Sequence, residues 1–166
     1  MMELIPTPSQ TIGPFFHLCL TSQTDLDSLE GERIRLVCRI LDGDGTPVND
    51  AMIEIWQADA AGEYGRFGRL CTNPDGVCVF DTVKPGRVDP QAPHVSVMIF
   101  ARGLLKQLYT RIYFAGESSN ASDAVLALVP DDRRATLMAH QDPEDSNVWN
   151  FEIRLCADCE TVFFDV

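Results

Sequence analysis

The chain has 166 residues, of which 45% are hydrophobic and 23% charged, a composition typical of one globular domain and unlike that of a disordered, collagen-like or coiled-coil chain. Its 25 Asp and Glu residues outnumber its 13 Lys and Arg residues, and the net charge of −12 disfavours nucleic acids and anionic membranes as partners. No apolar run reaches the roughly 18 residues of a membrane span, and the start of the chain does not resemble a signal peptide. We therefore expect a soluble, cytoplasmic protein with neither nucleic-acid nor membrane partners.

The first 30 residues are predicted to form an extended arm followed by a loop. Proline and glycine recur through residues 1–20, which disfavours a helix there, and the residues that follow are polar and acidic. We place the start of the globular domain at residue 31. Residues 1–30 are then the arm and loop, and residues 31–166 are the domain.

Short segments that alternate apolar and polar residues fill most of this domain. In the first, Ile34, Leu36, Cys38 and Ile40 fall on one face, and arginines fall on the other. Asp-Gly and Asn-Pro-Asp-Gly sequences between segments are typical of tight turns. The pattern predicts an all-β fold, an antiparallel β-sandwich. The predicted strands cover residues 33–41, 51–57, 67–72, 77–83, 94–102, 107–114, 148–155 and 161–166.

A helical pattern is found only at residues 122–139. Ser122 is suited to cap a short helix that ends near Val129. Pro130 and the two aspartates after it are suited to the first turn of a second helix. The sequence therefore predicts a short helical excursion between two strands.

Six cysteines must be assigned a role. Cys38 and Cys78 lie in alternating segments and are predicted to be reduced core residues, as is usual in the cytoplasm. Cys156 and Cys159 have the spacing of a CxxC motif, but no second pair and no helix follows them. We therefore do not assign them a metal or redox site.

Four short motifs are more specific together than any one of them alone. They are the TPSQTIGPF string of the arm, IEIWQAD with the following GEY, TVKPG, and APHVS with the following FARG. Their order and spacing resemble the intradiol ring-cleavage dioxygenases over nearly the whole chain. Within that family the sequence most resembles the alpha subunits of two-subunit members. The resemblance implies O₂-dependent cleavage of protocatechuate, between its two hydroxyl-bearing carbons, to 3-carboxy-cis,cis-muconate.

The resemblance also implies an incomplete metal site. Metal-binding members hold a non-haem ferric ion with two tyrosines and two histidines; phenolate oxygens are hard donors that suit Fe(III), and the bound catecholate becomes electron-rich toward O₂. Tyr64 and His94 match one ligand of each kind. Val88 stands at the second tyrosine position and Ser96 at the second histidine position, and neither is a comparable donor. The resemblance therefore implies that this chain alone binds no iron, and that a beta subunit holds the Fe(III).

The family further implies that the arm of such an alpha subunit lines the partner's pocket for the aromatic substrate. The matching positions are Thr11, Gly13, Pro14 and Phe15, the last often a tyrosine in the family, so that a hydroxyl contact is absent here. Arg102 matches an arginine near the pocket, where a guanidinium would favour a substrate carboxylate. From the sequence alone, a solvated arginine at the end of a strand is the better explanation of Arg102, and only the resemblance makes the two explanations about equal.

Three other interpretations remain open at this point. They are a non-enzymatic β-sandwich binding module, a dioxygenase subunit for another catechol, and a self-sufficient iron dioxygenase with unusual ligands. Val88 and Ser96 argue against the last of these. Retention of the arm motif and Arg102 favours a pocket-forming subunit over a bare scaffold.

Overall fold

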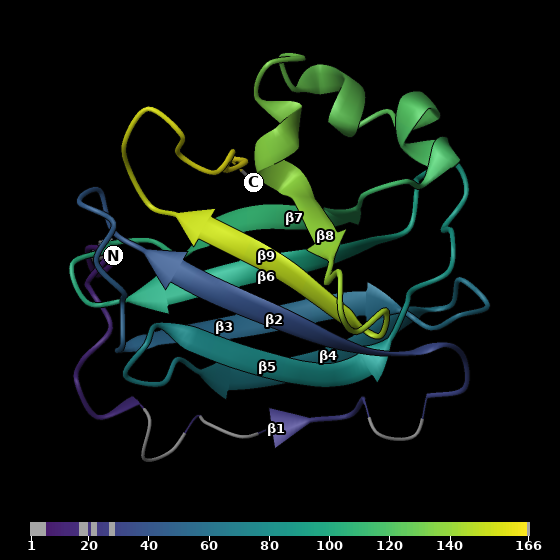
Figure 1. Cartoon of the computed structure of the whole chain (residues 1–166). Helices are drawn as coiled ribbons and strands as arrows, with labels where there is room; N and C mark the ends of the chain where they lie inside the picture. Colours follow the sequence, from purple (N-terminus) through teal and green to yellow (C-terminus); the bar gives the residue numbers. More distant parts are fainter. Residues whose placement is uncertain (1–5, 17–19, 21–22, 27–28, 166) are drawn as a thin grey trace, which may run out of the picture.

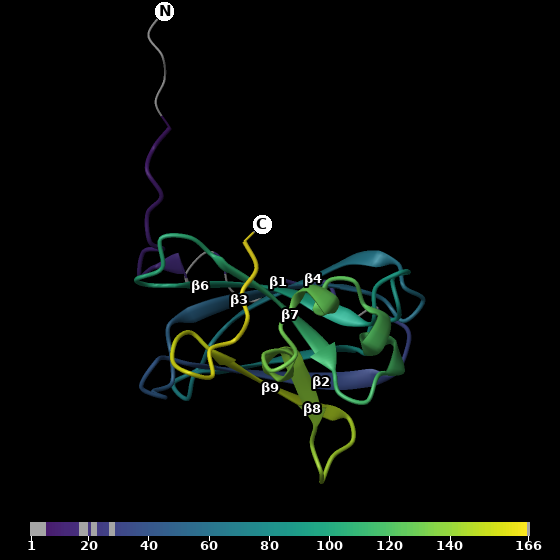
Figure 2. The ribbon, with the colours of Figure 1, turned by 90° about the horizontal axis from the view of Figure 1, so that it is seen from above.

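We describe a computed structural model of the chain, in which residues 6–16, 20, 23–26 and 29–165 are placed (Figure 1). Two β-sheets pack face to face, as the view from above shows (Figure 2), so the predicted all-β sandwich is confirmed. The strands are β1 (Gln23–Thr24), β2 (Arg33–Leu41), β3 (Ala51–Ala58), β4 (Tyr64–Cys71), β5 (Val77–Val83), β6 (His94–Ala101), β7 (Leu108–Phe114), β8 (Met138–Gln141) and β9 (Val148–Arg154).

The strand order explains how the two sheets are joined. One sheet runs β1-β4-β3-β6-β7 and the other β9-β2-β5, and β8 pairs with β7 in the first and with β9 in the second. Most pairings are antiparallel, as predicted. The pairings of β2 with β9 and of β7 with β8 are parallel, which the local alternation did not indicate.

The core lies between the sheets and follows the alternation of the strands. Ile34, Leu36, Cys38 and Ile40 of β2 are all at most 2% exposed, as predicted, and Cys78 lies opposite Cys38 in the pairing of β2 with β5. Burying such side chains contributes about 1.5–3 kcal/mol each for the larger ones. Both predicted core cysteines are therefore structural.

The predicted helical excursion at residues 122–139 is present as a minor feature, but its helices are short and of the 3₁₀ type. The segment holds three short 3₁₀ helices, η1 (Ser118–Ser122), η2 (Leu126–Leu128) and η3 (Arg134–Leu137), and then enters β8. Asp123, not Ser122, accepts hydrogen bonds from the next backbone N–H groups. Val129 is extended, as the residue before a proline usually is, so no longer helix can form across it.

The predicted last strand is wrong. In the described part of residues 161–166, β pairing is limited to an isolated bridge between Phe164 and Tyr109. The backbone N–H of Thr161 instead donates to the carbonyl of Arg154, which closes the loop after β9. The alternating pattern of the terminus reflects packing of Val162 and Phe164 beneath the 3₁₀ segment.

The region predicted as arm and loop contributes to the sandwich. Its strand β1 pairs with β4, and Leu26 and Leu29 are buried in the core. The division at residue 31 remains a prediction. In the placed part of the chain, none of the helices has the length and apolarity needed to cross a membrane.

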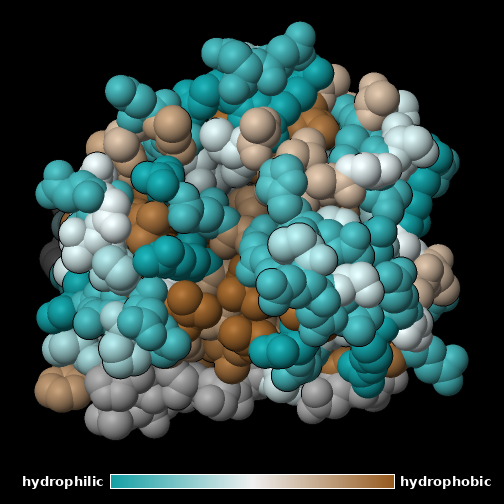
Figure 3. Space-filling view, viewed as in Figure 1, coloured by the Kyte–Doolittle hydropathy of each residue, from teal (hydrophilic) through white to brown (hydrophobic). Residues whose placement is uncertain are grey.

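The face formed by β9, β2 and β5 carries hydrophobic side chains in its middle (Figure 3). A hollow of about 520 Å³ on this side is lined by Val37, Val77 and Met138 together with Arg39 and Arg154. None of the predicted site residues lines this hollow. The candidate site therefore has to be sought on the opposite sheet, around β6.

Candidate functional site

The predicted site residues gather in two clusters at opposite ends of β6. His94 begins this strand and Arg102 follows its last residue, Ala101. A strand rises about 3.3 Å per residue, so the Cα atoms of His94 and Arg102 are roughly 26 Å apart. We call the first group, Tyr64, Val88, His94 and Ser96, the ligand-position cluster, and the second, Thr11, Pro14 and Arg102, the arm cluster.

A tight turn between β3 and β4 positions Tyr64. The carboxylate of Asp59 accepts hydrogen bonds from the backbone N–H groups of Ala61 and Glu63, both at 2.9 Å. The N–H of Gly86 donates to the backbone carbonyl of Asp59 at 2.8 Å, and a Cβ at Gly86 would lie 2.3 Å from the carbonyl oxygen of Ala60. Only glycine allows this approach, which brings the segment that carries Val88 against the turn that carries Tyr64.

His94 is buried and has its tautomer fixed by the backbone. Its Nδ1 lies 2.8 Å from the carbonyl oxygen of Ala92, and since that oxygen only accepts, Nδ1 carries the proton and Nε2 keeps its lone pair. Burial lowers the pKa of His94, and the bond to Ala92 offsets part of this. A neutral histidine that donates its other N–H to a carbonyl is the usual arrangement of a metal ligand.

The remaining ligand positions do not match that arrangement. The Ser96 hydroxyl oxygen accepts hydrogen bonds from the hydroxyls of Tyr64, at 3.0 Å, and of Tyr109, at 3.1 Å. Burial raises the pKa of Tyr64, so its phenol stays protonated at neutral pH. Val88 offers no donor atom. Tyr64 and His94 alone therefore do not fit the family's ferric site.

Sequence reasoning missed the residues that β7 adds to this cluster. Tyr109, Arg111 and Tyr113 lie opposite Met98, Ser96 and His94 in the pairing with β6. Their alternation along the strand shows that they share one face, but only the pairing register shows that this face is that of His94 and Ser96. The alternation of Tyr109, Arg111 and Tyr113 in the predicted strand 107–114 could have indicated a polar face.

Asp123 anchors two neighbours of the ligand-position cluster, Tyr113 and Ala92. It is 1% exposed and accepts a hydrogen bond from the hydroxyl of Tyr113 at 3.0 Å and from the N–H of Ala92 at 2.8 Å. Burial raises the pKa of Tyr113 to about 12. Burial alone would also raise the pKa of Asp123, but the hydrogen bonds it accepts outweigh this and lower it. Asp123 is thus an ionised anchor for the segment that precedes His94.

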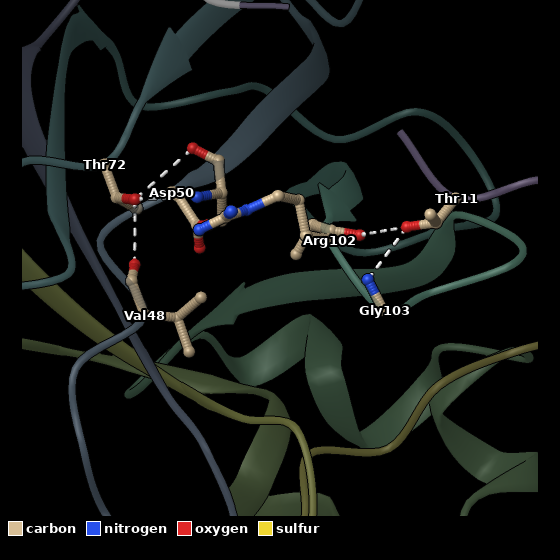
Figure 4. Close-up of polar contacts among 8 residues, drawn as sticks. Thr11, Val48, Asp50, Thr72, Arg102 and Gly103 are labelled. Atoms are coloured by element: carbon tan, nitrogen blue, oxygen red, sulfur yellow. Dashed lines mark hydrogen bonds and ion pairs between the residues drawn. The ribbon is translucent and has the colours of Figure 1, made fainter. Parts of the chain in front are cut away.

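At the other end of β6, the arm is attached through Thr11 (Figure 4). The Thr11 hydroxyl accepts a hydrogen bond from the N–H of Gly103 at 2.8 Å and donates to the carbonyl of Ala101 at 3.5 Å. Gly103 has a φ of +93°, a conformation that glycine adopts without strain. The turn after β6 is therefore the docking point of the arm.

The arm residues after Thr11 divide between core and solvent. Phe16 is 9% exposed, whereas Phe15 is 71% exposed. Pro14 lines a hollow of about 370 Å³ that Arg102 also lines. Gly13 has no atom within 4 Å of the place where a Cβ would be, so contacts within this chain do not require a glycine there. The structure brings Thr11, Pro14 and Arg102 to one place and leaves the Phe15 ring projecting from it.

Arg102 forms an ion pair with Asp50 (Figure 4). Its Nε and Nη2 both contact the Oδ2 atom of Asp50. The segment that carries Asp50 is held by Thr72, whose hydroxyl donates to the carbonyl of Val48 at 2.8 Å and accepts from the N–H of Ala51 at 3.1 Å. The guanidinium is therefore positioned at the arm, and an incoming carboxylate would share it with Asp50.

A sequence model described as Dioxygenase matches residues 12–157 of the chain. Together with the sandwich fold, this match means that the chain belongs to the intradiol ring-cleavage dioxygenase family.

Individual relatives are more specific. The chain is 41% identical to a protocatechuate 3,4-dioxygenase alpha chain from Burkholderia cepacia, over 100% of both chains. It is 29% identical to the beta chain of the Burkholderia cepacia enzyme, over 79% of this chain and 65% of that one. Among solved structures, the dioxygenase domain of a carbohydrate-binding fusion protein from Streptomyces sp. SirexAA-E is similar with a TM-score of 0.69 and 25% identity, covering 95% of this chain and 100% of that one.

Proposed function

We propose that the chain is the pocket-forming alpha subunit of a two-subunit protocatechuate 3,4-dioxygenase. The whole enzyme would break the ring bond between the two hydroxyl-bearing carbons and add both atoms of O₂, giving 3-carboxy-cis,cis-muconate. The observation that carries this proposal is the similarity to a protocatechuate 3,4-dioxygenase alpha chain over the full length of both chains. The partial similarity to a beta chain supports it, as does the presence of Val88 and Ser96 at two positions where the resemblance implies ligands.

The ferric ion of this enzyme is proposed to lie on the beta subunit. The family uses Fe(III). In this chain, Val88 has no donor atom and the Ser96 hydroxyl already accepts hydrogen bonds from two tyrosines. A partner with all four ligands would supply what this chain lacks, and this chain would supply part of the wall of the substrate pocket.

The arm cluster is the proposed contribution to that pocket. Thr11, Gly13, Pro14 and Phe15 would face the partner, since Phe15 is 71% exposed and the contacts of this chain leave Gly13 open. Arg102 would attract the carboxylate of protocatechuate. Its ion pair with Asp50 is the observation that favours the second candidate, a related catechol without a carboxylate, because the guanidinium charge is already balanced.

The proposed location is the cytoplasm. Five cysteines of the described chain, Cys38, Cys71, Cys78, Cys156 and Cys159, are all free, as expected in a reducing compartment. The net charge of −12 is also consistent with a proposed partner that is a protein and neither nucleic acid nor membrane.

Co-expression with a four-ligand beta subunit tests the proposal. Iron content and protocatechuate-dependent O₂ uptake are measured for this chain alone, for the beta subunit alone and for the two together. We expect an iron-free, inactive lone chain and an iron-containing complex that is more active than the beta subunit alone. Stoichiometric iron and turnover in the lone chain would refute the subunit assignment, as would a complex no more active than the beta subunit.

A further inference from the structure

The loss of two ligands leaves open what fills the centre of the ligand-position cluster. Arg111 is the residue of β7 that lies directly opposite Ser96 on β6, and so opposite one of the two lost ligand positions. Alternation places its side chain on the same face as His94 and Ser96. Arg111 is not one of the four ligand positions, but it lies next to one of them, Ser96.

The guanidinium of Arg111 extends toward the other lost position. Its Nη1 donates a hydrogen bond to Oε1 of Gln91 at 2.7 Å. Gln91 forms a bridge with Val88, whose carbonyl accepts the Gln91 N–H at 2.7 Å. The Arg111 side chain therefore reaches from the β7 residue opposite Ser96 to the residue that bridges Val88.

The electrostatic surroundings of Arg111 agree with this placement. Arg111 acts on the charge of both remaining ligand residues: it disfavours the protonated form of His94 and favours the ionised form of Tyr64. Burial lowers the pKa of Arg111 itself, but the neighbouring hydroxyls of Tyr113 and Tyr109 outweigh this and raise it, so the guanidinium stays charged. Its buried Nε has no acceptor within the described chain.

We infer that Arg111 is a built-in cation that stands in the place of the ferric ion and excludes a metal from this chain. The same side chain links both lost ligand positions, and its fixed positive charge repels any cation that Tyr64 and His94 would bind. Restoring the two ligands alone would then leave the site closed to iron. This inference rests on the family's ligand pattern and not on the proposed partner, and it is tested on the chain by itself.

The test restores the ligands with and without the cation. Three full-length variants are compared: V88Y/S96H, V88Y/S96H/R111Q and V88Y/S96H/R111K. Each is incubated with ferric iron, desalted, and measured for bound iron and for the visible absorption band of tyrosinate bound to Fe(III). We expect at least about tenfold more bound iron in V88Y/S96H/R111Q than in the other two variants, because lysine keeps the charge that glutamine removes.

Two results would overturn the inference. One is equal iron binding by all three folded variants, which would mean that the ligands alone decide. The other is a folded V88Y/S96H/R111Q variant that binds no more iron than V88Y/S96H, which would mean that the guanidinium does not block the site.

A second measurement avoids the double ligand substitution altogether. In the otherwise unchanged chain, the pKa of the His94 imidazole is followed by NMR in Arg111→Gln and Arg111→Lys. We expect the pKa of His94 to rise in the Arg111→Gln variant and to stay near its original value in Arg111→Lys. An unchanged pKa in Arg111→Gln would show that the guanidinium is not close to His94, and the inference would fail even if the multiple variants did not fold.

Discussion

The two ends of β6 carry polar clusters of opposite kinds. At the start of the strand, His94 and Ser96 are buried, and their hydrogen bonds close on neighbours within the chain. At the end, Arg102 is exposed, and the arm that docks beside it presents Phe15 to solvent. The side chains at the start of β6 are bonded within the chain, whereas those at its end are open to contact from outside. In the proposed pair of subunits, the cluster at the start of β6 would no longer need metal ligands, and the cluster at its end would contact the partner.

The largest effect is expected from removal of the arm. Deleting residues 1–15 leaves Phe16 in place but removes Thr11 from the turn at Gly103. We expect kcat/KM of the complex to fall by about a hundredfold, or ~2.7 kcal/mol, while the lone chain keeps its fold. Thr11→Val is the matched control, since it breaks only the docking hydrogen bonds and should cost less. Unchanged turnover after the deletion would show that the arm does not contribute to the substrate pocket.

Asp123→Ala should be the most damaging single substitution at the closed end. It leaves the Tyr113 hydroxyl and the N–H groups of Ala92, Val125 and Leu126 without their acceptor. We expect the free energy of unfolding to fall by about 2 kcal/mol, measured by urea denaturation. A loss below about 0.5 kcal/mol would indicate that water replaces the carboxylate.

The pH dependence of stability provides a second test of the hydrogen bonds that Asp123 accepts. The pKa of Asp123 is lower in the folded chain than in the unfolded chain, so its contribution is full above about pH 4 and is lost as the pH falls through the folded value. The difference in stability between the unmodified chain and Asp123→Asn should therefore be largest near neutral pH and shrink below about pH 4. A constant difference would mean that the charge of Asp123 is not involved.

A smaller and more selective effect is expected at the open end. Arg102→Ala in the complex should raise KM for protocatechuate by about tenfold, or ~1.4 kcal/mol, and leave KM for catechol nearly unchanged. Asp50→Asn removes the competing carboxylate without touching the arginine, and should lower KM for protocatechuate. Equal losses for both substrates in Arg102→Ala would favour a purely structural ion pair.

The smallest effect concerns His94. Its pKa is lowered by burial, so between the unfolded value of about 6.5 and the folded value the unfolded chain binds a proton that the folded chain does not. Stability should therefore fall as the pH drops below about 6.5, and His94→Gln should flatten this part of the profile. An identical profile in the variant would assign the dependence to other groups.

Local patterns predicted the strands well but not their neighbours. The alternation of Ile34, Leu36, Cys38 and Ile40 predicts a half-buried strand, but it carries no information on which strand pairs with it. That β2 pairs with β9 in parallel depends on a contact across more than a hundred residues, which no local pattern contains. The 3₁₀ segment differs from the predicted helices for the same reason, since Asp123 is held by Tyr113 and Ala92 from other parts of the chain.

The candidate site was predictable in its residue types and not in its grouping. The motif positions Tyr64, His94, Val88 and Ser96 remain a prediction as family ligand positions, and the hydrogen bond between Tyr64 and Ser96 is visible only in the structure. Arg102 was placed correctly at a strand end, but its partner Asp50 lies 52 residues away in sequence. Arg111 was missed because its relation to Ser96 is set by strand register and not by any motif.

The short strand β8 has a consequence for how this chain can associate. Because β8 hydrogen-bonds to both sheets, the series of strands in the described part of the chain ends only at β1 and β5. At one of these ends the outermost strand, β1, is just two residues long, which blunts it as a template for another chain's strand. Edge-to-edge addition is thus limited at the β1 end, and the proposed companion subunit would instead recognise the sheet faces and the exposed arm.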